Sequence, residues 1–434
     1  MMRSLLTSPP VVSISMTANF LDMNLKIRYS WLLAIITMIY YMNTSCNQAN
    51  GANKEVVQED YLSEHFEGVI TGAERIRMYL PLLKDKKVGL VVNQSSLVMG
   101  KHLLDTLLEM DVEVAAIYTP EHGFRGEADA GDHIASGKDE RTGIPIVSLY
   151  GDKRKPSADD FAPVDILIFD IQDVGVRFYT YVGTLHYVME TAAETGKPVI
   201  VLDRPNPNGH YVDGNVLDTA YHSFVGMHPV PIVHGMTIGE YAQMINGEGW
   251  LGNGVHCELT VIPCLQYDHQ TKYVLPVKPS PNLPNLRAVL LYPSLCLFEG
   301  TIMSIGRGTD KQFQVLGNPD FKGDFSFTPE PKPGAHKPKL EGELCHGFDF
   351  TTINEDDIRR WRKVDLSYLV EAYSQLKDHN FFIEKSFDRL AGTDVLRKQI
   401  ESGMTYDAIH ATWTDPLEQF KKIRKKYLLY TDFE

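Results

Sequence analysis

Runs of apolar residues alternate with amphipathic periods from about residue 68 onward. Continuous apolar runs predict buried strands at 87–92, 112–118, 144–150, 165–170 and 198–202. Apolar positions at helical spacing follow the first of these runs at 103–108 and the fourth at 182–192, where Gly196 ends the pattern. Buried strands separated by amphipathic helices predict a parallel sheet covered on both faces. We therefore expect a Rossmann-like α/β domain over residues 65–262.

The second half of the chain is less regular. A helical pattern follows Thr237, and the apolar run at 258–262 predicts one more strand. Two proline-rich stretches, 276–284 and 319–347, predict a loop and an irregular excursion. Helical periods return at 366–376, 395–400 and 417–428. We expect a smaller auxiliary α+β domain over residues 263–434.

The first 46 residues are expected to be an export signal. Lys26 and Arg28 precede an apolar run of eleven residues, 31–41, which is too short to span a bilayer and suits a signal sequence. Small residues before Cys46 resemble the cleavage site of bacterial lipoproteins, in which such a cysteine carries the lipid. Residues 1–46 then form the signal segment and 47–64 a tether. This predicts a lipid-anchored protein of the cell envelope that faces the periplasm and touches the membrane through its N-terminal lipid only. A plain signal peptide or an uncleaved anchor is the alternative.

Charge argues against one class of partner. The chain has 42 basic and 56 acidic residues, a net charge of −14, and 39 against 55 without residues 1–46. Such a surface repels polyphosphate, and no basic stripe offsets it, so we expect no nucleic-acid partner.

Polar clusters follow four of the predicted strands. Because ligands of open parallel sheets bind at the carboxyl ends of the strands, four polar strand ends predict a ligand crevice. The clusters lie at 93–95, 119–126, 170–179 and 203–207, and contain Asn93, Glu121, His122, Arg125, Asp170, Asp173, Arg177, Tyr179 and Asn206.

Several well-known chemistries lack their motifs in this chain. The first strand leads into Asn93-Gln94-Ser95 instead of a glycine-rich dinucleotide turn. The chain contains no Walker A motif, no H-E-x-x-H and no G-x-S-x-G. His122 has no second histidine at metal-ligand spacing. We expect a site without cofactor or metal.

Three further clusters lie downstream. Residues 231–240 contain His234 and then Thr237 and Glu240 at capping-box spacing, which gives Glu240 a structural role. Residues 279–284 form a proline-rich loop that can orient Asn282, and residues 298–309 place Glu299 and Arg307 among small residues.

Together these clusters resemble a family of bacterial exo-β-N-acetylmuramidases, which was long known only as a domain of unknown function. The matching stretches are 120–126, 173–181, 202–207, 234–240, 279–284 and 298–309. Asn93-Gln94-Ser95-Ser96 departs from the family's usual Asn-Gln-Thr-Gly. The resemblance implies a Rossmann-like catalytic domain, an auxiliary C-terminal domain and a cleft between them. It also implies release of terminal β-1,4-linked N-acetylmuramic acid from the non-reducing end of peptidoglycan fragments, such as muropeptides and the N-acetylmuramic acid–N-acetylglucosamine disaccharide.

The family motif makes Glu121 the catalytic glutamate, which we interpret as the general acid of glycoside hydrolysis. Glu299 is our candidate for the second carboxylate, with Asp170 and Asp173 as alternatives, unless Glu299 only neutralises Arg307. Guanidinium groups suit the lactyl carboxylate of muramic acid, and the candidates are Arg125, Arg177 and Arg307. Each of these arginines could instead pair with an aspartate to hold a loop. The remaining candidates for substrate contacts are Asn93, His122, Tyr179, Asn206, His234 and Asn282.

Two other functions remain open from the sequence. One is a lipoprotein that binds muropeptides without cleaving them. The other is an esterase or amidase acting on the cell wall, against which the missing nucleophile elbow and metal motifs count.

Overall fold

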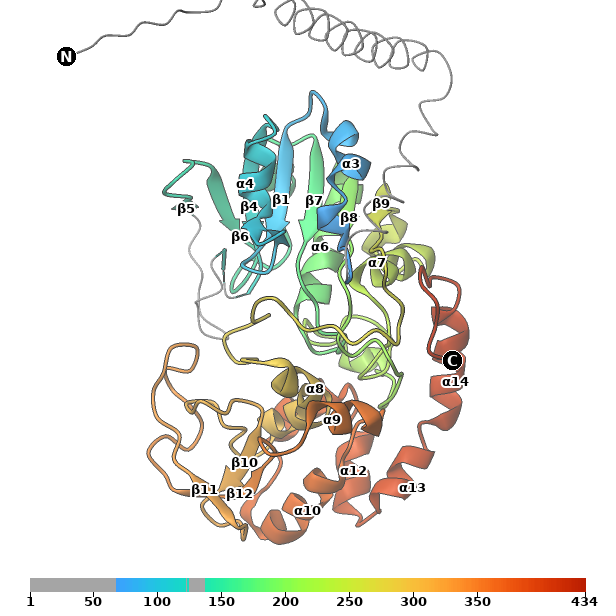
Figure 1. Cartoon of the computed structure of the whole chain (residues 1–434). Coiled ribbons are helices and arrows are strands. Elements are labelled where there is room, and N and C mark those ends of the chain that lie inside the picture. Colours follow the sequence, from blue (N-terminus) through green and yellow to red (C-terminus); the bar gives the residue numbers. More distant parts are fainter. Residues whose placement is uncertain (1–67, 122, 125–136) are drawn as a thin grey trace, which may run out of the picture. The chain divides into compact units, whose positions relative to one another are not determined.

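The computed structural model describes residues 68–121, 123–124 and 137–434 (Figure 1). The predicted signal segment, the tether, Cys46, His122 and Arg125 lie outside the described residues. Within those ranges, no helix combines the length and the apolar character needed to cross a bilayer.

A seven-stranded sheet forms the N-terminal part, in the order β5-β6-β4-β1-β7-β8-β9. All neighbours are parallel except β5, which pairs antiparallel with β6 at one edge. Numbered along the chain, the six parallel strands lie in the order 3-2-1-4-5-6, so the predicted Rossmann-like fold is confirmed. The strands are β1 (Val88–Val92), β4 (Val114–Thr119), β5 (Gly137–Lys138), β6 (Pro145–Ser148), β7 (Ile166–Asp170), β8 (Val199–Leu202) and β9 (Leu259–Ile262).

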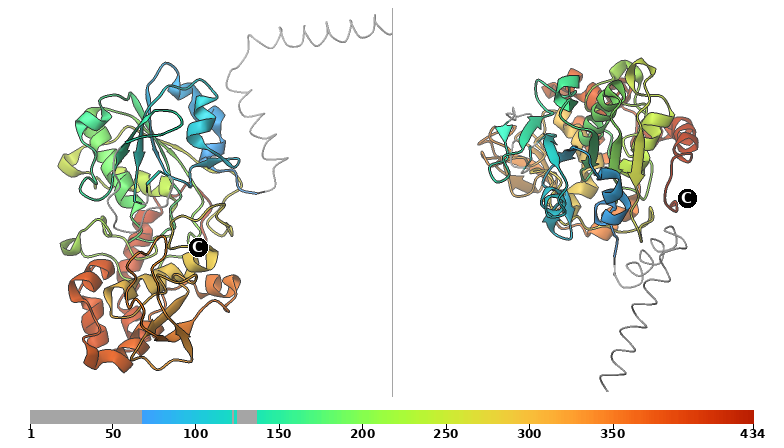
Figure 2. Two further views of the ribbon diagram at one scale, coloured as in Figure 1. Left: turned by 90° about the vertical axis from the view of Figure 1, so that its left-hand side faces the viewer. Right: turned by 90° about the horizontal axis from the view of Figure 1, so that it is seen from above.

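Helices cover both faces of this sheet, as the continuous apolar strands predict (Figure 2). In β1, Val88, Leu90 and Val92 pack on one face with the leucines of α4, whereas Val91 packs on the other face with α6 and α7. The helices are α3 (Ile76–Tyr79), α4 (Leu103–Leu108), α5 (Ala158–Phe161), α6 (Tyr181–Thr195) and α7 (Ile238–Gly247). Gly196 ends α6 with φ of 64°, and the predicted capping box of Thr237 and Glu240 begins α7.

Short elements complete this part of the chain. They are the hairpin β2 (Leu97–Val98) and β3 (Lys101–His102), and the 3₁₀ turns η1 (Gly72–Glu74), η2 (Leu80–Leu83), η3 (Thr219–Tyr221) and η4 (Gly252–Gly254).

The C-terminal part is the expected smaller α+β unit. A three-stranded antiparallel sheet, in the order β10-β12-β11, packs with several helices (Figure 1). Two of its strands lie wholly or partly in the proline-rich stretch 319–347, so that stretch is not irregular throughout. The predicted boundary near residue 262 stays a prediction. The elements are α8 (Leu286–Leu295), η5 (Cys296–Gly300), β10 (Val315–Asn318), β11 (Phe325–Phe327), β12 (Cys345–Asp349), α9 (Glu355–Trp361), α10 (Ser367–Leu376), η6 (Lys377–His379), α11 (Glu384–Ala391), α12 (Val395–Glu401), α13 (Tyr406–Ala411) and α14 (Thr414–Arg424).

The last residues of the chain return to the parallel sheet. The Tyr430 hydroxyl donates to Asp203 Oδ2 at 2.5 Å, just past the end of β8. The Leu429 backbone N–H donates to Glu240 Oε1 at 2.8 Å, and Arg424 donates to the Gly235 carbonyl at 2.7 Å. One apolar cluster runs through both parts, so they share a core.

Candidate active site

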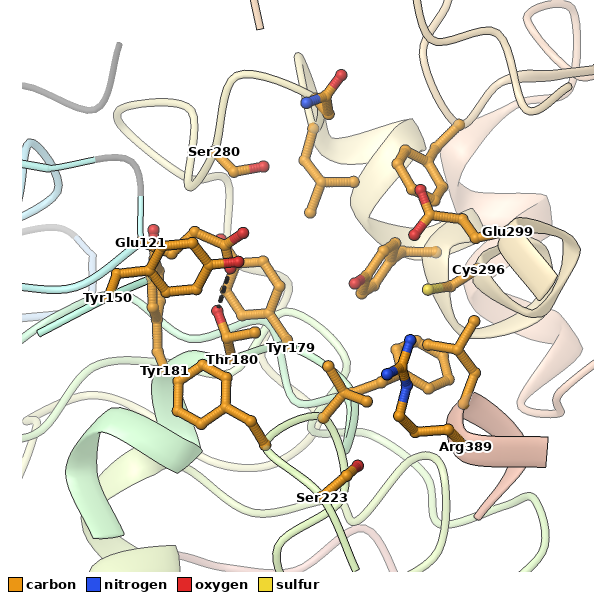
Figure 3. Close-up of a pocket in the computed structure, with 18 of the residues that line it drawn as sticks. Glu121, Tyr150, Tyr179, Thr180, Tyr181, Ser223, Ser280, Cys296, Glu299 and Arg389 are labelled. Atoms are coloured by element: carbon orange, nitrogen blue, oxygen red, sulfur yellow. Dashed lines mark hydrogen bonds between the residues drawn. The ribbon is translucent and has the colours of Figure 1, made fainter. Parts of the chain in front are cut away.

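A cavity of about 290 Å³ lies at the carboxyl ends of the strands, where loops of the parallel sheet meet the C-terminal part (Figure 3). This volume is at the small end of the range of about 300–1,000 Å³ typical of ligand pockets. The lining residues come from segments far apart in the sequence: Glu121, Tyr150, Arg154, Phe178–Tyr181, Ser223–Val225, Ser280, Asn282, Leu283, Tyr292, Cys296, Glu299, Arg307, Phe313, Arg389 and Leu390.

Glu121 reaches this cavity from the end of β4. It lies two residues beyond Thr119, the last residue of the strand, and its side chain is buried. The hydroxyl of Thr180, which precedes α6, donates to Glu121 Oε2 at 2.7 Å. The parallel sheet therefore fixes the backbone of this glutamate, and α6 positions its carboxylate.

Glu299 lines the same cavity from the opposite side, on the 3₁₀ turn η5 (Figure 3). Both Nε and Nη2 of Arg307 lie 2.6 Å from its Oε1. Arg307 also stacks over the ring of Phe313, with its Cζ 5.2 Å from the ring centroid. The structure thus contains the ion pair considered as the alternative role of Glu299, and it also brings Glu299 to the cavity that holds Glu121.

Lys339 supports the turn that carries Glu299. Its Nζ donates to the carbonyls of Glu299 at 3.2 Å and Thr301 at 2.5 Å. Burial, opposed by the charge of Glu299, lowers the pKa of Lys339 to about 8.

Aromatic rings line the cavity together with the two carboxylates. Tyr179 contacts Tyr181 and Tyr292 edge to face, with ring centroids 4.7 and 5.9 Å apart. Burial raises the pKa of all three phenols above the usual value, so their hydroxyls stay protonated and can hydrogen-bond a ligand.

Asn282 reaches the cavity from the proline-rich loop predicted to orient it. Its Nδ2 donates to the Gly334 carbonyl at 2.8 Å. Its Oδ1 is buried, and the part of the chain that the structure describes provides no donor for it. This oxygen can accept a hydrogen bond from a ligand N–H or O–H.

Other candidates from the sequence lie outside the cavity lining. Asp170 is fully buried and forms two hydrogen bonds with Arg204, at 2.6 and 2.9 Å. Asp173 is buried as well, and its Oδ2 accepts from the Gly175 N–H at 2.6 Å. Burial raises the pKa of Asp173 to about 7. Of the three carboxylates considered as partners of Glu121, only Glu299 lines the cavity.

Arg177 also lies away from the cavity lining. It is buried, and its Nη1 and Nη2 donate to four backbone carbonyls, those of Asn215, Val230, Leu390 and Ala391. The loss of hydration lowers its pKa to about 9. Arg177 ties the strand-end loops to the end of α11.

The remaining candidates outside the lining hold turns. Asn93 Oδ1 accepts from the backbone N–H and the hydroxyl of Ser95. Asn206 bridges the Met236 carbonyl and the Asn208 N–H. His234 is buried against Tyr241, and burial lowers its pKa to about 3, so it is neutral.

Several lining residues were not among the candidates from the sequence. Thr180 lies within the matching stretch 173–181, directly after the candidate Tyr179. This position is the only feature of the sequence that points to Thr180 as a site residue. Arg389 comes from α11, in a stretch without any motif, and only the fold brings it to the cavity (Figure 3). Tyr150, Arg154 and Phe224 lie on loops with no distinctive composition.

Comparisons with known proteins cover both parts of the chain. Residues 88–287 match the family described as exo-beta-N-acetylmuramidase NamZ, N-terminal, and residues 290–430 match its C-terminal counterpart. A protein of Bacillus subtilis (strain 168) named peptidoglycan beta-N-acetylmuramidase NamZ is 40% identical over 378 residues, which cover 81% of this chain and 89% of that protein.

Two solved structures from Bacteroides fragilis NCTC 9343, both titled DUF1343 family proteins, have the same fold. One is 49% identical with a TM-score of 0.79, and the match covers 84% of this chain and all of that one. The other is 28% identical with a TM-score of 0.69, over 84% of this chain and 99% of that one.

Proposed function

Since this chain belongs to the exo-β-N-acetylmuramidase family, we propose that it hydrolyses peptidoglycan fragments in the cell envelope and releases terminal N-acetylmuramic acid from the non-reducing end. The observation that carries the proposal is the meeting of Glu121 and Glu299 in one small cavity. Glycoside hydrolysis needs a proton donor and commonly a second carboxylate on either side of the reacting bond. A small cavity suits the end of a glycan chain better than its middle.

In the proposed mechanism Glu121 protonates the glycosidic oxygen. Thr180 holds its carboxyl group in place through Oε2. Glu299 is the second carboxylate, and the contacts of Arg307 with its Oε1 orient it. An ionised carboxylate can act as a nucleophile at the anomeric carbon or as a base toward water. The anomer released first, followed by nuclear magnetic resonance, distinguishes these two roles.

The decisive experiment is hydrolysis of the N-acetylmuramic acid–N-acetylglucosamine disaccharide by the wild-type protein and by Glu121→Gln, because a sugar leaving group needs a proton from the acid. Loss of the proton donor should lower kcat by about 10²- to 10⁴-fold while the melting temperature stays unchanged. Glu109→Gln serves as a matched control, because Glu109 is exposed at the end of α4 and pairs with Lys101.

Two results would contradict the proposal. Absence of any turnover of muramides by the wild-type protein, together with tight fragment binding, would favour the non-catalytic binding protein. Unchanged turnover by Glu121→Gln would remove Glu121 from the role of general acid.

A further inference from the structure

The two sides of the cavity differ in chemistry. Glu121 lies with Tyr150, and Arg154 packs on Tyr150 and Phe224. Glu299 lies with Arg307, Arg389 and the ring of Phe313. If Glu121 protonates the oxygen between two sugars, one sugar must lie on each side of it. The asymmetry of the cavity therefore bears on the direction in which the substrate lies.

Tyr150 is placed beside Glu121 by the register of the sheet. Thr119 of β4 pairs with Ser148 of β6, and the Leu149 N–H donates to the Thr119 carbonyl at 2.8 Å. Glu121 lies two residues beyond Thr119, and Tyr150 lies two residues beyond Ser148. The two neighbouring strands therefore place both residues at the same edge of the sheet. Figure 3 shows both on the side of the cavity opposite Glu299.

Phe224 is held on the same side by α6. Gly183 of this helix has no side chain, and a Cβ there would come within 2.8 Å of the Phe224 ring. Tyr187, one turn further along α6, stacks on Phe224 with an interplanar angle of 6°. Because α6 also carries Thr180 at its start, the contact of Thr180 with Glu121 and this aromatic contact share one rigid element.

Arg154 joins the two rings into one surface. Its Cζ lies 4.6 Å from the centroid of Phe224 and 5.9 Å from that of Tyr150. Among the described residues it has neither an ion pair nor a hydrogen bond, and it is exposed. Its five N–H donors are therefore available to a ligand that packs against the rings.

Arg389 is the corresponding group on the other side. Its guanidinium points into the cavity from α11 (Figure 3), and within the described ranges it has no acidic partner. Arg307 differs, because Glu299 already neutralises it. Arg389 is thus suited to a carboxylate that enters with the substrate.

We propose that Tyr150, Phe224 and Arg154 form the subsite for the leaving sugar, a neutral N-acetylhexosamine, and that the carboxylate-bearing sugar lies toward Arg389 and Glu299. The inference rests on the proposed function. The apolar face of a sugar ring can pack on the two aromatic rings, and its hydroxyl and acetamido oxygens can accept from Arg154. Glu121 then lies between the two sugars. Glu299 lies on the side of the carboxylate-bearing sugar, N-acetylmuramic acid.

The test measures inhibition by each free product, N-acetylglucosamine or N-acetylmuramic acid, during turnover of a chromogenic muramide. Phe224→Ala and Arg154→Ala should each raise the inhibition constant of N-acetylglucosamine by about 3- to 10-fold and leave that of N-acetylmuramic acid unchanged. Arg389→Ala should do the reverse. Arg154→Ala also covers the case in which Phe224→Ala does not fold, because Arg154 is exposed. Lys153→Ala is the matched control, since this neighbouring cation pairs with Asp160 and does not line the cavity.

Each other outcome has a definite meaning. If Arg154→Ala instead raises the inhibition constant of N-acetylmuramic acid, the substrate lies in the opposite direction and the inference is wrong. If Arg154→Ala changes neither constant, these residues form no subsite. If the wild-type protein turns over no muramide at all, the proposed function fails and this inference fails with it.

Discussion

Asp173 is a buried acid whose ionisation the fold opposes. Burial raises its pKa to about 7, whereas an aspartate in an unfolded chain has a pKa of about 3.9. Between these values the folded state binds more protons than the unfolded state, so the free energy of unfolding falls as the pH rises from about 4 to about 7. Above about pH 7 the free energy of unfolding falls no further on account of Asp173.

Asp173→Asn should remove this loss, because an amide oxygen can accept from the Gly175 N–H without carrying a charge. We expect the variant to melt several degrees higher than the wild-type protein at pH 8, and by a clearly smaller margin at pH 5, on the basis of about 1.4 kcal/mol per unit of pKa difference. Melting temperatures at both pH values check this. The exposed Asp324→Asn is the control. An equal difference at pH 5 and pH 8 would show that Asp173 is not the titrating group.

Single residues also show how much of the site can be predicted from the sequence. The strand-end clusters were predicted to surround a ligand, and Glu121 and Tyr179 do line the cavity. Arg177 comes from the same motif as Tyr179 but binds backbone carbonyls. Polar residues at tight turns either face a ligand or satisfy the buried backbone of the turn, and both roles select the same residue types. Only the folded arrangement separates them.

Among the elements, the proline-rich segment of residues 329–342 connects two loops of the cavity. The Gly334 carbonyl accepts from Asn282, and the Glu330 N–H donates to the Gly308 carbonyl at 2.9 Å. Lys339 completes these contacts by binding the turn of Glu299. The segment therefore positions cavity residues without lining the main cavity itself.

Lys339→Met should disturb Glu299 without touching the substrate cavity directly. We expect kcat to fall by about 10- to 100-fold with little change in KM, because the catalytic geometry loosens. Lys339→Arg should recover part of the rate, since a guanidinium also donates to carbonyls.

The pH profile separates positioning by Lys339 from a general structural role. The pKa of Lys339 lies at about 8, so its charge is lost as the pH rises above that value, and the wild-type rate should decline there. Glu299 and Arg307 are the charged groups facing it. In Lys339→Arg the decline should move to higher pH, because arginine keeps its charge. An unchanged alkaline limb would contradict this role.

The parallel strands were predictable and the small antiparallel sheet was not, for a physical reason. Buried parallel strands are continuous apolar runs, as in β7. In the small sheet Gly317 pairs with Gly347, and a Cβ on Gly347 would lie within 1.9 Å of the Leu316 carbonyl. Close backbone contact therefore requires glycines where a strand normally shows alternating apolar residues.

At the scale of the whole molecule, the last seven residues connect the end of the chain to the parallel sheet. Asp203 and Glu240 are buried, and both accept hydrogen bonds from this tail. Asp432 pairs with the buried Arg424, with two contacts of 2.8 Å. The tail thus satisfies buried charged groups that lie more than 180 residues earlier in the sequence as well as one nearby.

Deletion of residues 428–434 should remove one hydrogen-bond donor from each of Asp203 and Glu240, and the acidic partner of Arg424. We expect the melting temperature to fall by about 5–15 °C, because each hydrogen bond lost from a buried charged group costs about 1–3 kcal/mol. Tyr430→Phe removes only the hydroxyl that donates to Asp203, so the melting temperature should fall by a smaller amount than in the deletion. Melting followed by circular dichroism checks both variants, and an unchanged melting temperature in the deletion would contradict the prediction.

The position of this tail also constrains the order of events during synthesis. The ribosome makes the strands of the parallel sheet first, yet the buried acids Asp203 and Glu240 gain their contacts with this tail only when Leu429 and Tyr430 have emerged. The parallel-sheet part therefore gains its full set of buried hydrogen bonds only after these late residues have been made.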